Sequence, residues 1–185
     1  AGLDAISAKD ASAGIKEALT KGADFAVDSL GKENGFLGNP QVKIPLPDSL
    51  KKAEQAMKLL GKGKQADELV DTMNHAAETA VASAKPILIE SINKMTVTDA
   101  KDILTGGNDS VTNYFRRTTS ESLTKKFTPI VQSATRKVEL GAQYDKFAAK
   151  GVKLGIIDAK DANLDSYVTQ KALDGLYTMI AEKER

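Results

Sequence analysis

Apolar side chains recur at the spacing of an α-helix over most of this chain. Residues 15–30 carry one apolar stripe, for which Asp10 or Ser12 is suited to the N-cap and Gly31 to the end. The clearest stripe covers residues 66–84, where apolar residues keep a three-four-three spacing over about five turns. The pattern therefore predicts two long amphipathic helices in the N-terminal half.

Proline and glycine mark the limits of the next segments. Pro86 breaks or kinks the second helix, and the nearly all-apolar residues 87–92 predict a buried continuation. Thr96 and Asp99 match a capping box, so we expect a helix of about two turns that ends at Gly106-Gly107.

The helix that follows is suited to begin at a cap supplied by Asp109 or Ser110. Its apolar face starts with Val111 and Phe115. Thr128-Pro129 resembles an N-cap followed by proline at the first helical position, which predicts a new helix or a bend there.

Two further helical segments complete the chain. Residues 140–148 carry a short apolar stripe, and residues 164–180 carry a broad one behind a cap at Asp161 or Asn163. A stripe this wide indicates that the last helix occupies a central, mostly buried position.

The longest stretch without helical period is residues 31–47, GKENGFLGNPQVKIPLP. Its three glycines and three prolines exclude a regular helix. A short helix capped by Asp48 or Ser49 is expected to follow and to end at Gly61. Because no strand of consequence is predicted, we expect an all-α fold, in which residues 1–185 form a single-domain bundle of about eight helices with one long irregular Gly/Pro-rich loop at 31–47.

The composition excludes several classes of function but does not identify one. The formal net charge of +1 over 185 residues lacks the basic surplus of a nucleic-acid binder, so we expect no nucleic-acid partner. The absence of cysteine excludes disulfides and thiolate chemistry. No run approaches the roughly 18 apolar residues that a membrane span requires, so we expect no transmembrane segment.

Neither a metal site nor a catalytic group is predicted. The single histidine, His75, lies about 200° from Met73 on a helix, which indicates a surface position opposite the apolar stripe. The acidic run from Asp158 to Asp165 lacks the glycine and the closing glutamate of a calcium loop. We therefore expect no metal, no cofactor and no catalytic residue.

The segment 104–117, LTGGNDSVTNYFRR, is the best candidate for a binding site. Glycines before a helix are suited to an anion, but the spacing of a nucleotide-binding loop is absent. The alternative is a structural corner in which Asp109, Asn113 and Arg116 satisfy one another. The candidate binding residues are Asn108, Asp109, Asn113, Tyr114, Arg116 and Arg117.

Three segments together resemble a known family. They are GFLGNPQVKIPLP at 35–47, MTVTDAKDILTGGNDSVTNYFRRTT at 95–119 and DANLDSYVTQKALDGLYTMIAEKE at 161–184. The chain is similar in these segments to the bacterial family catalogued as domain of unknown function 4197. Precursors of that family typically carry an export or lipoprotein signal. The resemblance implies a periplasmic or lipoprotein-anchored protein whose signal peptide is absent from this chain, which starts like a trimmed product.

The leading hypothesis is a non-enzymatic envelope-associated binding or interaction protein. Its ligand would be a lipid-like molecule between helices, or its partner an envelope protein that meets the 31–47 loop. An enzyme is the less favoured interpretation. The alternative is an anion-binding protein or enzyme with its site at the Gly106-Gly107 corner and Arg116 and Arg117.

Overall fold

The computed structural model describes residues 2–48, 51, 59, 61, 63–107, 109–137 and 163–184. These residues contain six α-helices and no strand, so the all-helical prediction is confirmed. The helices are α1 (Gly2–Leu30), α3 (Gly63–Ala82), α4 (Lys85–Asn93), α5 (Val97–Thr105), α6 (Ser110–Thr135) and α8 (Leu164–Glu184). The two other expected helices, at 48–61 and 140–148, fall outside the described residues apart from isolated positions. None of the described helices combines the length and hydropathy needed to cross a membrane.

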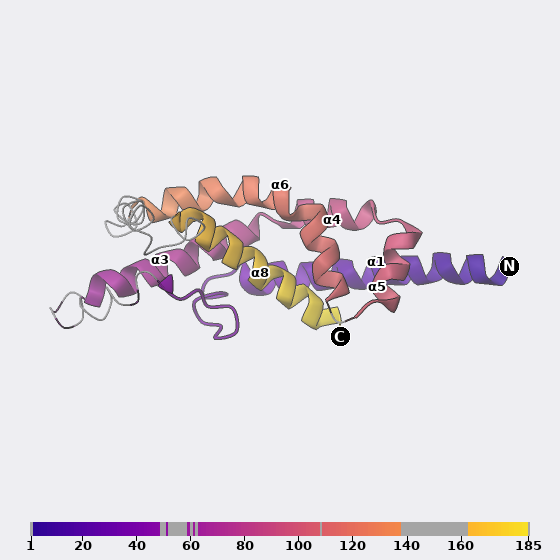
Figure 1. Ribbon diagram of the computed structural model, residues 1–185, viewed down its shortest axis with the longest axis horizontal. Helices are drawn as coiled ribbons and strands as arrows, with labels where there is room; N and C mark the ends of the chain where they lie inside the picture. Colours follow the sequence, from indigo (N-terminus) through magenta and orange to yellow (C-terminus); the bar gives the residue numbers. More distant parts are fainter. Residues whose placement is uncertain are drawn as a thin grey trace.

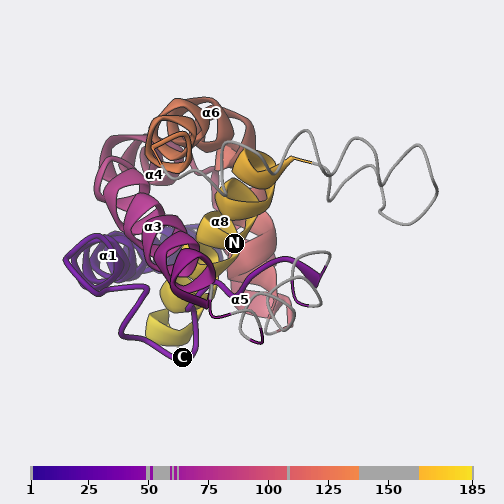
Figure 2. The ribbon, with the colours of Figure 1, turned by 90° about the vertical axis from the view of Figure 1, so that its left-hand side faces the viewer.

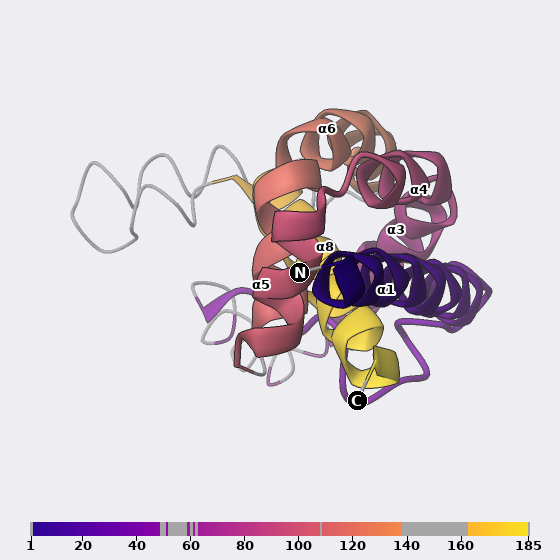
Figure 3. The ribbon, with the colours of Figure 1, turned by 90° about the vertical axis from the view of Figure 1, so that its right-hand side faces the viewer.

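The helices form an elongated bundle (Figure 1). α1 runs along one side and extends beyond the other helices at its N-terminal end, while α3 and α6 run antiparallel along the opposite end. The two end views place α8 in the middle of the bundle, with α6 on one side and α1 and α3 on the other (Figures 2 and 3). α8 accordingly packs against α6, α1 and α3.

One continuous aliphatic core fills the bundle. It includes Leu19 and Leu30 of α1, Leu69 and Met73 of α3 and Phe115 of α6, all at most 1% exposed. α8 contributes eight buried apolar residues: Leu164, Val168, Ala172, Leu173, Leu176, Tyr177, Ile180 and Ala181. The central position predicted for the last helix is confirmed, because apolar residues on nearly every side of α8 are covered.

Several predicted helix ends are confirmed by their hydrogen bonds. Thr96 and Asp99 form the capping box of α5, with the Thr96 Oγ1 accepting from Asp99 N at 3.0 Å and Asp99 Oδ2 accepting from Thr96 N at 3.1 Å. Asn163 caps α8 by accepting from Ser166 N at 3.0 Å. α1 ends before Gly31, where a Cβ atom would lie 2.6 Å from the carbonyl oxygen of Val27.

One predicted boundary is wrong, and one of the two alternatives at a second position is excluded. α1 passes through Asp10 and Ser12 and begins at Gly2, because the preceding residues are helix formers and Ser12 is buried within the helix. No new helix begins at Thr128-Pro129, since α6 continues to Thr135. Pro129 is exposed, and its missing amide removes one helical hydrogen bond, which α6 tolerates.

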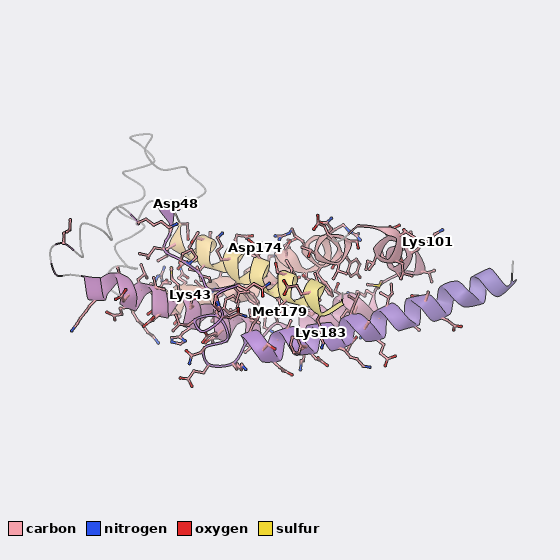
Figure 4. The ribbon with its side chains drawn as sticks, turned by 90° about the horizontal axis from the view of Figure 1, so that it is seen from below. Lys43, Asp48, Lys101, Asp174, Met179 and Lys183 are labelled. Atoms are coloured by element: carbon pink, nitrogen blue, oxygen red, sulfur yellow. The ribbon has the colours of Figure 1, made fainter. Side chains whose placement is uncertain are left out.

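Residues 31–47 form turns and irregular backbone without a helix, and they contact α3 and α8. Four of their side chains, Phe36, Val42, Ile44 and Leu46, are buried in the core. Seen from below, α8 runs along this face with Asp174, Met179 and Lys183 along its length, beside the segment that carries Lys43 and Asp48 (Figure 4).

Candidate functional site

The predicted corner forms a tight joint between α5 and α6. α5 ends at Gly106, where a Cβ atom would lie 2.6 Å from the carbonyl oxygen of Asp102 and 2.8 Å from Cβ of Ser110. Ser110 donates its hydroxyl to the carbonyl of Ile103 at 3.1 Å and so ties the start of α6 to the end of α5. Asp109 stands at the N-cap of α6 but makes no capping hydrogen bond with its side chain, contrary to the expectation.

The expected Asp109–Asn113–Arg116 network does not form. Arg116 donates from Nη2 to Oδ1 of Asp174 on α8 at 2.9 Å, and its guanidinium lies 5.2 Å from the centre of the Tyr177 ring. The physical reason is that α6 packs against α8, which brings a carboxylate of another helix within reach. Asn113 is exposed, and its backbone N–H donates to the carbonyl of Asp109 at 2.8 Å as an ordinary helical bond.

Arg117 and Tyr114 join α6 to the preceding helices. Arg117 lies 3.4 Å from Oδ1 of Asp99 on α5 and 5.6 Å from the centre of the Tyr114 ring. The Tyr114 hydroxyl is buried and donates to the carbonyl of Ser91 at 2.7 Å. The hydrogen bond from Thr96 N is the main cause that holds the pKa of Asp99 below its usual value, with Arg117 contributing less.

A cavity of 470 Å³ opens at this corner. It is lined by Asp99, Asp102, Ile103, Ser110, Asn113, Tyr114 and Arg117. The structure thus brings three of the candidate residues, Asn113, Tyr114 and Arg117, to one cavity, whereas Arg116 faces α8 and Asn108 lies outside the described residues. Two carboxylates share the lining with one arginine that is already paired, which is unfavourable for an anion.

A larger groove of 740 Å³ lies between α3 and α6, where the sequence predicted no site. Its apolar side chains are Ala76, Pro129, Ile130 and Ala134, and its polar side chains are Glu68, Thr72, His75, Thr79, Ser133 and Lys137. α3 and α6 run antiparallel, so Glu68 and Lys137 lie toward one end of the groove and Thr79 and Pro129 toward the other.

His75 of this groove contacts a buried carboxylate, Glu78, whose side chain is 5% exposed. Glu78 accepts hydrogen bonds from Asn34 N at 3.1 Å, Phe36 N at 3.0 Å, Leu37 N at 3.0 Å and His75 Nδ1 at 2.8 Å. Burial alone would raise the pKa of Glu78, but these four hydrogen bonds lower it below its usual value. His75 is therefore a surface side chain, 46% exposed, that is tied at one nitrogen to a buried anion.

Asn74, like Glu78, holds the 31–47 segment to α3 by hydrogen bonds to its backbone. Its side chain accepts from Ile44 N at 2.7 Å and donates to the carbonyls of Ile44 at 3.0 Å and Val70 at 2.8 Å. Asn74 and Glu78 are four residues apart on α3 and both fall on its buried side. Two polar residues at this spacing on an apolar face are the sequence signal that could have indicated these partners, since buried polar groups require hydrogen bonds.

Within the described ranges, no group of three or more histidine, cysteine or acidic side chains is placed to hold a metal ion.

Comparison with known proteins gives one result. A family model described as protein of unknown function (DUF4197) matches residues 5–185. No curated protein and no solved structure matches the chain.

Proposed function

The chain belongs to this DUF4197 family, and we propose that it is a non-enzymatic binding protein of the bacterial cell envelope. We place it in the periplasm, or on a lipid anchor, after removal of a signal peptide. Its α3–α6 groove holds a small amphipathic molecule. The observation that carries this proposal is the groove itself.

The size and lining of the groove support a small-molecule ligand. Its volume of 740 Å³ falls in the range of roughly 300–1,000 Å³ that is usual for such sites. Ala76, Ile130 and Ala134 offer apolar contact, and six polar or charged side chains border them. Such a lining combines apolar contact with polar groups that can orient a ligand.

The full chain supplies one histidine and no cysteine, so neither a thiol nor a pair of imidazoles is available to the groove. A protein partner at residues 31–47 is less favoured, because the apolar side chains of this segment are buried in the protein's own core.

A pair of matched substitutions on α6 tests the proposal. Ser133 lines the groove, whereas Ser122 is exposed on the same helix and does not line it. Ser133→Trp fills the groove, and Ser122→Trp adds the same ring elsewhere. Protein purified from an envelope fraction is analysed by native mass spectrometry and by lipid extraction.

We expect a co-purifying small molecule with the unsubstituted protein and with Ser122→Trp. Ser133→Trp is expected to reduce its occupancy by about tenfold or more, because an indole takes the place of the ligand. Equal occupancy in both variants, or no bound molecule in any sample, contradicts the proposal.

The second candidate is an anion-binding site or active site at the Gly106-Gly107 corner. The meeting of Asn113, Tyr114 and Arg117 at one cavity favours it, and the two carboxylates there weigh against it. Arg117→Ala distinguishes the two proposals. Loss of binding to phosphate or acetate with unchanged folding supports the corner site, and an absence of such binding in the unsubstituted protein rejects it.

A further inference from the structure

The tautomer of His75 follows from its partner. The Glu78 carboxylate accepts three backbone N–H groups, and an ionised carboxylate can only accept hydrogen bonds. The contact of 2.8 Å between His75 Nδ1 and Glu78 Oε1 therefore requires the proton on Nδ1. In the neutral ring, Nε2 is then the nitrogen with a free lone pair, and it is a hydrogen-bond acceptor.

The position of this acceptor is fixed by the fold. Glu78 is buried and held by backbone groups of the 31–47 segment, so it orients the imidazole in the way that outer carboxylates orient functional histidines. His75 is 46% exposed and lines the α3–α6 groove, so the ring is accessible from that groove.

A second acceptor is the hydroxyl of Thr79, which also lines the groove. Thr79 donates its hydroxyl hydrogen to the carbonyl of His75 at 3.0 Å, which leaves its oxygen lone pairs as acceptors. The groove therefore presents two such acceptors beside its apolar wall.

The charges of the lining cancel. Glu68 and Lys137 supply one negative and one positive charge, and both lie toward the same end of the groove. An anionic head group near Lys137 would also meet Glu68, and a cationic head group near Glu68 would also meet Lys137. Neither sign of charge is favoured, so the lining is matched to an uncharged head group that donates hydrogen bonds.

We infer that the ligand of the α3–α6 groove is an aliphatic molecule with an uncharged hydroxyl-bearing head group, and that a hydroxyl of this head donates to Nε2 of His75. This inference rests on the proposed function and specifies the class of molecule bound.

Three probes with carbon chains of the same length test the head group: 1-decanoylglycerol, decanoate and decylamine. Binding of each is measured by isothermal titration calorimetry below its micellar concentration. We expect 1-decanoylglycerol to bind at least about fivefold more tightly than either charged probe, which corresponds to one additional hydrogen bond. Equal or tighter binding of decanoate or decylamine overturns the inference but leaves the groove as a binding site. Failure of all three probes to bind overturns the proposed function as well.

Two substitutions of His75 separate its two nitrogens. His75→Asn places an amide N–H near the position of Nδ1, which keeps the bond to Glu78 and the fold but removes the acceptor at Nε2. His75→Gln places its amide near the position of Nε2, where the amide oxygen can accept a hydrogen bond from the ligand. We expect His75→Asn to weaken 1-decanoylglycerol by about five- to tenfold while His75→Gln keeps more of the affinity. Unchanged binding by a folded His75→Asn protein overturns the inference.

Discussion

Replacing Glu78 by glutamine tests the hydrogen bonds that hold the 31–47 segment to α3. The change keeps the shape of the side chain and removes its charge. The amide oxygen can still accept from Phe36 and Leu37 in place of Oε2. The amide nitrogen, however, replaces Oε1 and meets the N–H of Asn34 and the Nδ1 of His75, which are donors.

The cost can be estimated from these contacts. An unsatisfied N–H of Asn34 is expected to cost about 1–3 kcal/mol. The bonds to Phe36 and Leu37 lose their charge assistance, which weakens them by roughly half and adds about 1 kcal/mol. His75 can turn to solvent because it is half exposed. We therefore expect Glu78→Gln to lower the free energy of unfolding by about 3 kcal/mol at neutral pH.

The loss in free energy of unfolding caused by Glu78→Gln depends on pH. The pKa of Glu78 in the folded protein is lowered from its ordinary value of 4.5. The stabilisation by this carboxylate is therefore fully present above about pH 4.5 and is lost as the pH falls through the folded pKa. The difference in stability between the unsubstituted protein and Glu78→Gln is expected to shrink as the pH falls below about 4.

Urea unfolding followed by circular dichroism measures this difference at each pH. Amide hydrogen exchange supplies a local measurement, since the N–H groups of Phe36 and Leu37 are expected to lose protection first. Glu121→Gln is the control, because Glu121 is exposed on α6 and pairs with the exposed Lys125, four residues away on the same helix, at 3.6 Å. A difference below about 1 kcal/mol at neutral pH, or one that does not shrink in acid, would refute the reasoning.

Three other substitutions are predicted from contacts of the described residues. Asn74→Ala removes both hydrogen bonds to the backbone of Ile44 and is expected to cost about 2–4 kcal/mol in urea unfolding, whereas a cost below about 1 kcal/mol shows that these bonds do not hold the 31–47 segment. Arg117→Ala is expected to cost only about 0–1 kcal/mol by the same measurement, because the Arg117 side chain is 65% exposed; a larger loss shows that the ion pair is more important than its exposure indicates. Gly175→Ala places a Cβ atom 3.0 Å from Cε2 of the buried Phe36 and is expected to lower stability by about 1–3 kcal/mol, measured as a reduced Tm, and an unchanged Tm means that the ring can move aside.

Local signals in the sequence predicted much of the fold. The capping box at Thr96, the cap at Asn163 and the end of α1 at Gly31 each depend on residues within one turn, so they could be read without tertiary information. The helix starts predicted at Asp10 and at Thr128-Pro129 are absent for the same reason. A residue suited to start a helix does so only when the preceding residues do not continue it, and at both positions the helix continues.

The candidate site was predictable only in part, because its contacts join distant segments. The sequence suggested that Arg116 pairs within its own corner, but Asp174 lies 58 residues away and reaches it only because α6 packs on α8. Glu78 likewise binds amides more than 40 residues distant. The groove between α3 and α6 depends on the packing of two helices separated by α4 and α5, which no periodicity within either helix describes.

The location of the bound molecule is the most direct test of the α3–α6 groove as the binding site. A 1-decanoylglycerol analogue with a diazirine in its acyl chain is bound to the protein and photolysed, and the labelled peptides are mapped by mass spectrometry. The predicted result is labels on residues 72–79 of α3, on residues 129–135 of α6 and on residues 136–137 beyond it. These labels are expected to be competed by unlabelled 1-decanoylglycerol and reduced in Ser133→Trp. Labels concentrated at the Gly106-Gly107 corner, or spread over the surface without competition, would contradict it.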